Sequence, residues 1–126
     1  MKIGDLFTTT GKPYFDARYT RTVDARGKSS FRIAIVGIGG RPAFNPSIVE
    51  VDPGQVLSVT VFQSGGLSAT FEHNFSIDGQ GIDENILAGK GHSVTVKVTV
   101  PESGTLTFFC KFHGATEQHA GEFRVG

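Results

Sequence analysis

Residues 93–110, SVTVKVTVPESGTLTFFC, decide the fold of this chain. Valine occupies every second position from Val94 to Val100, and threonine and lysine lie between, which is the period of a strand with one buried face. The Pro-Glu-Ser-Gly sequence that follows indicates a turn, and residues 105–110 alternate again. We therefore expect two strands joined by this turn, with the sulfur of Cys110 on the same face as the core side chains.

Similar patterns recur on both sides of this stretch. Residues 31–38 are rich in β-branched side chains and end at a Gly-Gly pair, and residues 47–51 and 55–62 flank an Asp-Pro-Gly turn. Residues 122–125 can form a short closing strand. No window has the periodicity of an amphipathic helix. Several short strands separated by turns predict an all-β, antiparallel sandwich.

The length of 126 residues suits one domain. Residues 1–30 are polar and show no sustained periodicity, so we interpret them as an N-terminal extension or linker. Residues 31–126 then form the folded domain. No apolar stretch is long enough for a membrane helix, and the first ten residues lack the apolar core of a signal peptide.

Charge and cysteine content exclude some classes of partner and some roles for the cysteine. Twelve basic residues balance twelve acidic ones and no basic run occurs, which argues against nucleic acid or an anionic membrane as the main partner. A single cysteine excludes an internal disulfide. It leaves a metal ligand, a nucleophile or an inert core residue as the possible roles of Cys110.

Histidine, cysteine and glutamine gather in two places. His73 ends a strand-like stretch, while Cys110, His113, Gln118 and His119 crowd the loop before the last strand. One soft thiolate and two imidazoles in a plane, with a weak axial donor, suit both Cu(II) and Cu(I). The set therefore predicts a copper site. Zinc bound by cysteine, two histidines and a fourth ligand is the alternative.

Residues 44–125 resemble the cupredoxins, the small blue copper proteins. The resemblance lies in Asn45–Val51, Pro53-Gly54, His73-Asn74-Phe75, Gly104–Cys110 and His113. It implies a Greek-key β-sandwich with one copper ion near one end, held by His73, Cys110 and His113. It also implies that the side chain of Asn74 hydrogen-bonds to the loop carrying Cys110, and that the protein is extracytoplasmic, either periplasmic or anchored at the cell surface.

The axial position departs from most of this family, because the sole methionine is Met1. Gln118 has the spacing of the usual axial ligand after Cys110 and looks like the axial glutamine of stellacyanin. His119 is the rival ligand. The number of residues between Cys110 and Gly121 is similar to the corresponding spacing in nitrosocyanin, a red copper protein. Nitrosocyanin, however, has a carboxylate in place of His73.

Two further residues near the motifs are not expected to be ligands. We expect Glu72 to be structural or exposed, since it lies on the opposite strand face from its neighbour His73. We expect His92 to be a turn residue far from the copper site.

The function implied by the resemblance is that of a type 1 copper protein, a one-electron carrier rather than an enzyme, which meets larger redox proteins briefly. An apolar docking patch is expected around Phe112, Gly114 and Ala115, with residues 37–44 on a nearby loop. The alternative is a copper enzyme or a protein that binds a small molecule such as nitric oxide, as suggested for red copper proteins, which requires an accessible copper. A dinuclear centre with two bridging cysteines is excluded because the chain has one cysteine.

Overall fold

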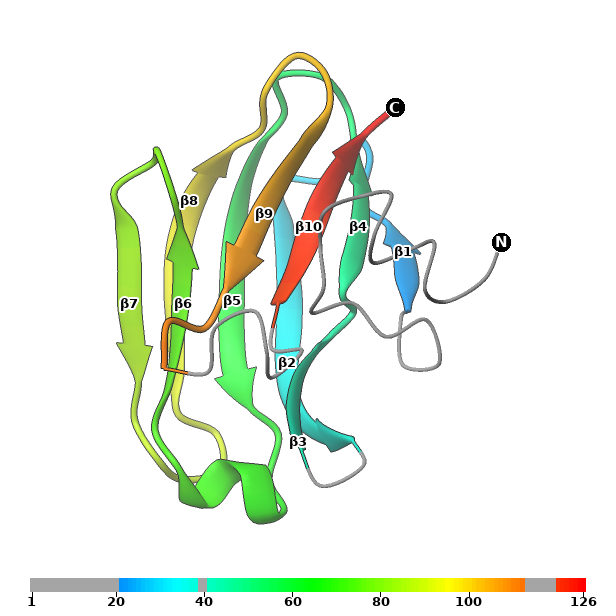
Figure 1. The fold of residues 1–126 in the computed structure, drawn as a ribbon. Helices are drawn as coiled ribbons and strands as arrows, with labels where there is room; N and C mark the ends of the chain where they lie inside the picture. The colour runs from blue at the N-terminus through cyan, green and yellow to red at the C-terminus, as the bar shows by residue number, and fades with distance from the viewer. Residues whose placement is uncertain (1–20, 39–40, 113–119) are drawn as a thin grey trace, which may run out of the picture.

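The fold consists of two β-sheets lying face to face (Figure 1). The computed structural model describes residues 21–38, 41–112 and 120–126. These residues form β1 (Thr22–Asp24), β2 (Ser30–Ile38), β3 (Arg41–Asn45), β4 (Ile48–Val51), β5 (Val56–Gln63), β6 (His73–Ile77), β7 (Ile82–Ile86), β8 (Ser93–Thr99), β9 (Thr105–Phe109) and β10 (Ala120–Val125), with one short 3-10 helix, η1 (Leu67–Thr70). No helix in this part of the chain is long and apolar enough to cross a membrane.

The predicted all-β sandwich is confirmed, but both sheets are mixed rather than purely antiparallel. One sheet has the order β1-β4-β10-β9-β6-β7 and the other β3-β2-β5-β8. The pairs β1–β4, β4–β10 and β2–β5 are parallel, and the remaining pairs are antiparallel. Side-chain alternation shows which face of a strand is buried but not which way its neighbour runs. The direction of pairing was therefore not visible in the sequence.

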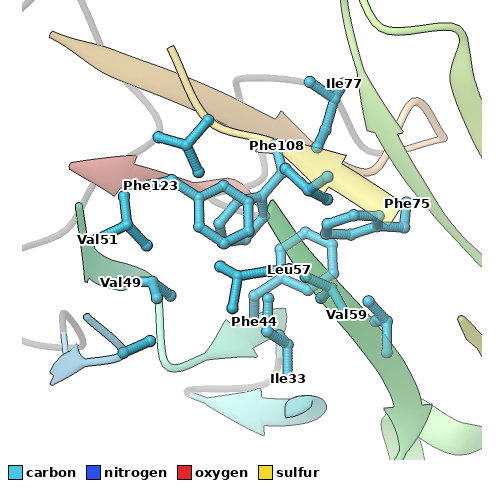
Figure 2. Packing of buried hydrophobic residues seen from close by; sticks show 14 of the residues in the cluster. Ile33, Phe44, Val49, Val51, Leu57, Val59, Phe75, Ile77, Phe108 and Phe123 are labelled. Atoms are coloured by element: carbon cyan, nitrogen blue, oxygen red, sulfur yellow. The ribbon is translucent and has the colours of Figure 1, made fainter. Parts of the chain in front are cut away.

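The alternating valines of β8 and the residue after it, Val100, behave as predicted. Val98 and Val100 are buried and Val94 and Val96 pack against the core, while the residues between them are exposed. Four buried phenylalanines, Phe44, Phe75, Phe108 and Phe123, meet in the space between the sheets (Figure 2). The Phe108 ring lies 5.2–5.3 Å from each of the other three ring centroids, within the range of favourable aromatic contacts.

Residues 22–25, which lie within the predicted N-terminal extension, take part in the fold. Strand β1 pairs with β4, and Ala25 is buried in the core. Residues 1–20 lie outside the described residues, so their role as an extension stays a prediction.

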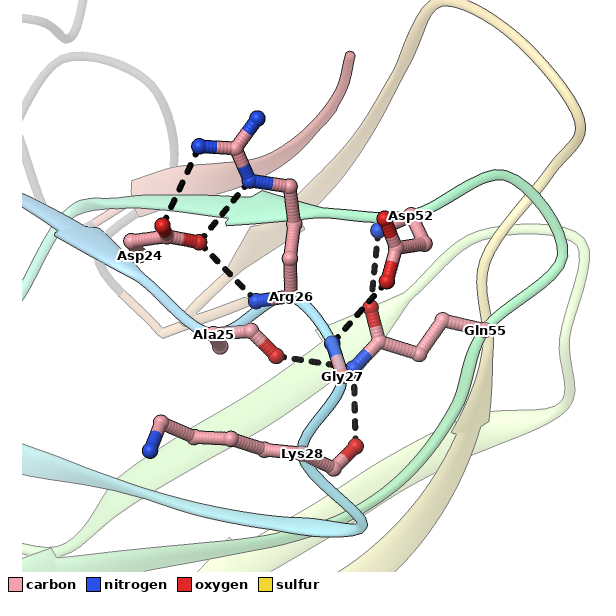
Figure 3. A network of polar contacts seen from close by, with 7 residues as sticks. All are labelled: Asp24, Ala25, Arg26, Gly27, Lys28, Asp52 and Gln55. Carbon is pink, nitrogen blue, oxygen red and sulfur yellow. Dashed lines mark hydrogen bonds and ion pairs between the residues drawn. The ribbon is translucent and has the colours of Figure 1, made fainter.

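A polar network fastens the loop after β1 to the turn between β4 and β5 (Figure 3). The amide of Gln55 donates to the carbonyl oxygens of Ala25, at 2.8 Å, and Lys28, at 2.7 Å, and its oxygen accepts from the backbone N–H of Asp52. The carboxylate of Asp52 accepts from the N–H of Gly27. One glutamine side chain thus holds two segments together at the start of β5.

Candidate metal centre

Cys110 directly follows β9 and is completely buried. It belongs to the core cluster that includes Phe108, which confirms that its side chain lies on the core face. Ser76 of β6 pairs with Phe109 of β9, and this antiparallel register continues to place Cys110 opposite Phe75, the neighbour of Asn74. The backbone N–H of Asn74 donates to the Cys110 sulfur at 3.3 Å. Such a donor stabilises negative charge on sulfur, which a metal-binding cysteine carries.

His73 is the first residue of β6 and is only 1% exposed. Its Nε2 lies 2.7 Å from the carbonyl oxygen of Ser68 in η1. A carbonyl can only accept, so Nε2 carries the proton. In the neutral imidazole the lone pair is then on Nδ1, and a hydrogen bond of this kind is how proteins set the tautomer of a metal-binding histidine.

The side chain of Asn74 connects β6 with both of its neighbours. Its Oδ1 accepts from the backbone N–H of Lys111, at 3.3 Å, and from the Ser76 hydroxyl. Its Nδ2 donates to Asp83, at 2.8 Å, and to Asn85, at 2.9 Å, both on β7. The predicted hydrogen bond between the Asn74 side chain and the loop carrying Cys110 is therefore present, with the Lys111 N–H as the donor. With the Asn74 N–H on sulfur, it holds residues 110 and 111 against β6.

A surface ion pair adds a further contact to the hydrogen bonds around Asn74. The ammonium of Lys111 lies 2.9 Å from the carboxylate of Asp83. Hydrogen bonds from Lys111 and then from Asn74 lower the pKa of Asp83 below its ordinary value, so the carboxylate stays charged at neutral pH. Both side chains are about half exposed, so the pair adds little to stability. Its effect is to fasten the residue after Cys110 to the edge strand.

The structure brings two of the four predicted ligands into one region, His73 and Cys110. His113, Gln118 and the rival His119 lie outside the described residues and stay predictions. Within the described ranges no three His, Cys, Asp or Glu side chains converge on one point. Glu72 is exposed, as expected. His92 is also exposed and lies in the connection between β7 and β8.

The predicted docking patch is only partly testable. Phe112 is exposed, whereas Gly114 and Ala115 lie outside the described residues. The expectation of a loop at 37–44 was wrong where the structure describes it, because residues 41–45 form β3 and pair with β2. Three large apolar side chains, Leu67, Phe71 and Leu87, are instead exposed on the segments that flank His73.

Two residues in the surroundings of His73 carried no signal in the sequence. Ser68 contributes through its backbone carbonyl, which every residue has. Gln63, at the end of β5, is buried and donates to the carbonyl oxygen of Phe71, two residues before His73. A glutamine at a strand end is ordinary, and only the fold shows what it touches.

No model of a known protein family matches the chain, and no curated protein matches it. Solved structures do. The metal-binding domain of CopA, the Cu(I)-exporting P-type ATPase of Streptococcus pneumoniae D39, solved with Cu(I), matches with a TM-score of 0.62 and 18% identity over 85% of this chain and 97% of that one. Auracyanin from Roseiflexus castenholzii matches with a TM-score of 0.58 and 19% identity over 79% and 98% of the two chains.

Auracyanin A, a blue copper protein from Chloroflexus aurantiacus, matches with a TM-score of 0.57 and 17% identity over 84% of this chain and all of that one. At such identities the likeness shows a common fold.

Proposed function

We propose that this chain, which has the cupredoxin fold, holds one copper ion between His73, Cys110 and His113 and acts as a one-electron carrier. Gln118 is proposed as the axial ligand. The observation that carries the proposal is the hydrogen bond from the Asn74 N–H to the buried Cys110 sulfur, next to a histidine whose tautomer is set. Bound copper would supply a Cu(II)/Cu(I) couple.

The described donor atoms fit copper. A buried cysteine sulfur and an imidazole are a soft and an intermediate donor, a combination that suits both oxidation states of copper. Both are held by backbone atoms of neighbouring segments, the N–H of Asn74 and the carbonyl of Ser68. Donors held in this way need not move when the charge of the ion changes. A small movement of the ligands between Cu(II) and Cu(I) favours fast electron transfer over substrate chemistry.

The exposed surface fits brief encounters. Leu67, Phe71, Leu87 and Phe112 present apolar side chains on segments adjoining His73 and Cys110. With no net charge, the chain has little long-range steering, so we propose small, transient interfaces with redox proteins. By the family resemblance we also propose an extracytoplasmic location.

A copper enzyme or small-molecule binder is the competing function, and it requires an open coordination position. Azide or nitric oxide added to the Cu(II) protein distinguishes the two. An electron carrier with four protein ligands should keep its spectrum, whereas a site that serves a small molecule should change it.

Copper should stabilise the fold, because a ligand that binds only the folded state raises the free energy of unfolding. At free Cu(II) one hundred times its dissociation constant the gain is about 2.7 kcal/mol. For a domain of this size that corresponds to a rise in Tm of roughly 10 °C. Thermal unfolding followed by circular dichroism measures it. His73→Ala should lose most of the rise, and an equal rise in that variant would mean that copper binds elsewhere.

Gln118→Met should raise the reduction potential. An amide oxygen is harder than a thioether and favours Cu(II). We expect a rise of at least about 59 mV, which is a tenfold change in a one-electron equilibrium. Voltammetry of the copper protein measures it, with His119→Ala as the matched control that should change little. If His119→Ala shifts the potential and Gln118→Met does not, His119 is the axial ligand.

A further inference from the structure

Gln63 is an unusual residue to bury. It ends β5 and its side chain is only 1% exposed. Its Nε2 donates to the carbonyl oxygens of Phe71, at 2.8 Å, and Leu87, at 3.3 Å. Its Oε1 is buried and has no hydrogen-bond partner among the described residues. An unsatisfied buried acceptor costs free energy. What the burial of Gln63 provides in return is its two donated hydrogen bonds.

The two carbonyls belong to the two segments that flank His73. Phe71 lies between η1 and His73 in the chain. Leu87 follows Ile86, and Ile86 is the residue paired with His73 across β6 and β7. One amide group therefore joins the segment that leads into His73 to the strand that lies opposite it.

The same segment carries the oxygen that orients the His73 ring. Ser68, in η1, accepts from Nε2 of His73 at 2.7 Å. The helix is one short turn without a side-chain cap, and its Leu67 is 74% exposed. Gly65 and Gly66, which connect it to β5, both have positive φ. Only Ser68 and Ala69 of its four residues are buried. A turn this short depends for its position on hydrogen bonds to its neighbours, which include the one from the Gly89 N–H to the Ala69 carbonyl oxygen at 2.7 Å.

We propose that Gln63 is a positioning residue for His73. By holding the Phe71 carbonyl against β5 and Leu87, it fixes η1, and η1 presents the Ser68 carbonyl that sets the orientation and tautomer of the imidazole. The inference about copper rests on the proposed function, since it takes His73 as a ligand. The inference about the ring itself does not.

The chain contains a matched control at the other end of the same strand. Gln55 immediately precedes β5 and also donates to two carbonyl oxygens, those of Ala25 and Lys28 (Figure 3). It acts on the loop after β1, on a segment that does not include His73. Gln55→Leu thus removes the same kind of clamp without touching the segments around the ring.

The first readout needs no metal. In the metal-free protein, NMR follows the exchange of the His73 ring N–H with solvent, relative to the backbone amide of Val59, which reports global opening. Gln63→Leu should speed ring exchange roughly tenfold relative to that amide, because the ordering of the ring is lost. Gln55→Leu should change the exchange rates of the His73 ring N–H and the Val59 amide by the same factor.

The second readout is Cu(II) affinity. Removing a group that orients a metal ligand typically weakens binding about tenfold or more, so Gln63→Leu should do so and Gln55→Leu should not. If Gln63→Leu does not fold, Gln63→Met, which keeps an unbranched chain of similar length, replaces it in both experiments. Two results would overturn the proposal. One is a folded Gln63 variant in which the ratio of His73 ring exchange to Val59 amide exchange is unchanged, and the other is a Gln55→Leu protein in which this ratio changes as much. A wild-type protein that binds no copper would overturn the proposed function while the ring exchange still decides the role of Gln63.

Discussion

Cys110→Ser is expected to abolish the intense visible absorption that Cu(II) gives this protein. The absorption arises from charge transfer between a thiolate and copper, and a serine hydroxyl is neither ionised at neutral pH nor soft. Cys110 is the only cysteine of the chain, so no second thiolate can replace it. Absorption spectra of both proteins after one equivalent of Cu(II) measure the effect.

Two controls make this result specific. His92→Ala removes an exposed imidazole in a turn and should leave the band intact. Circular dichroism must show that Cys110→Ser is folded, because a hydroxyl in this completely buried position costs about 1–3 kcal/mol if its hydrogen bonding is incomplete. A folded Cys110→Ser protein that keeps the band would exclude Cys110 as the ligand.

Gly121→Ala is expected to destabilise the fold by about 3 kcal/mol or more, at the upper end of what overpacking costs. Gly121 of β10 lies opposite Phe108 in β9. A Cβ atom there would overlap both the Phe108 ring and the carbonyl oxygen of Ser47. That oxygen already accepts from the N–H of Glu122 at 2.8 Å, so the backbone cannot shift without breaking a ladder hydrogen bond.

The matched control is Gly37→Ala, because Gly37 is also a strand glycine. A Cβ atom at Gly37 would make only ordinary contact with Ser68, at 3.8 Å, so that variant should be neutral or slightly more stable. Thermal unfolding should place Gly121→Ala roughly 10 °C below the wild type. Equal Tm values for the two variants would show that the Phe108 and Ser47 region is looser than the structure indicates.

The parts of the fold that were predictable are those whose faces differ in polarity. Strand β8 was predicted from its valines, and β9 from the alternation that ends at Cys110, since each has one face toward the core. The parallel pairing of β2 with β5 was not predicted, because it depends on the path of the chain between the sheets. Strand β1 was missed because three residues are too few to show a period.

For the candidate site, the sequence was informative about side chains and silent about backbone atoms. The sequence motif pointed to His73, Cys110 and Asn74, and the structure places them together through one hydrogen bond to sulfur. The Ser68 carbonyl has no sequence signature, and the role of Gln63 depends on where β5 ends relative to η1. His113 and Gln118 remain predictions from the loop spacing.

We propose that the chain binds one copper ion through a thiolate. Titrating the metal-free wild-type protein with Cu(II), followed by visible absorption and electron paramagnetic resonance, tests it most directly. We expect an intense band that grows to one equivalent and then stops, with the resonance signal of a single Cu(II) species. Cu(II) that binds without an intense band, or a band that continues to grow to two equivalents, would contradict it.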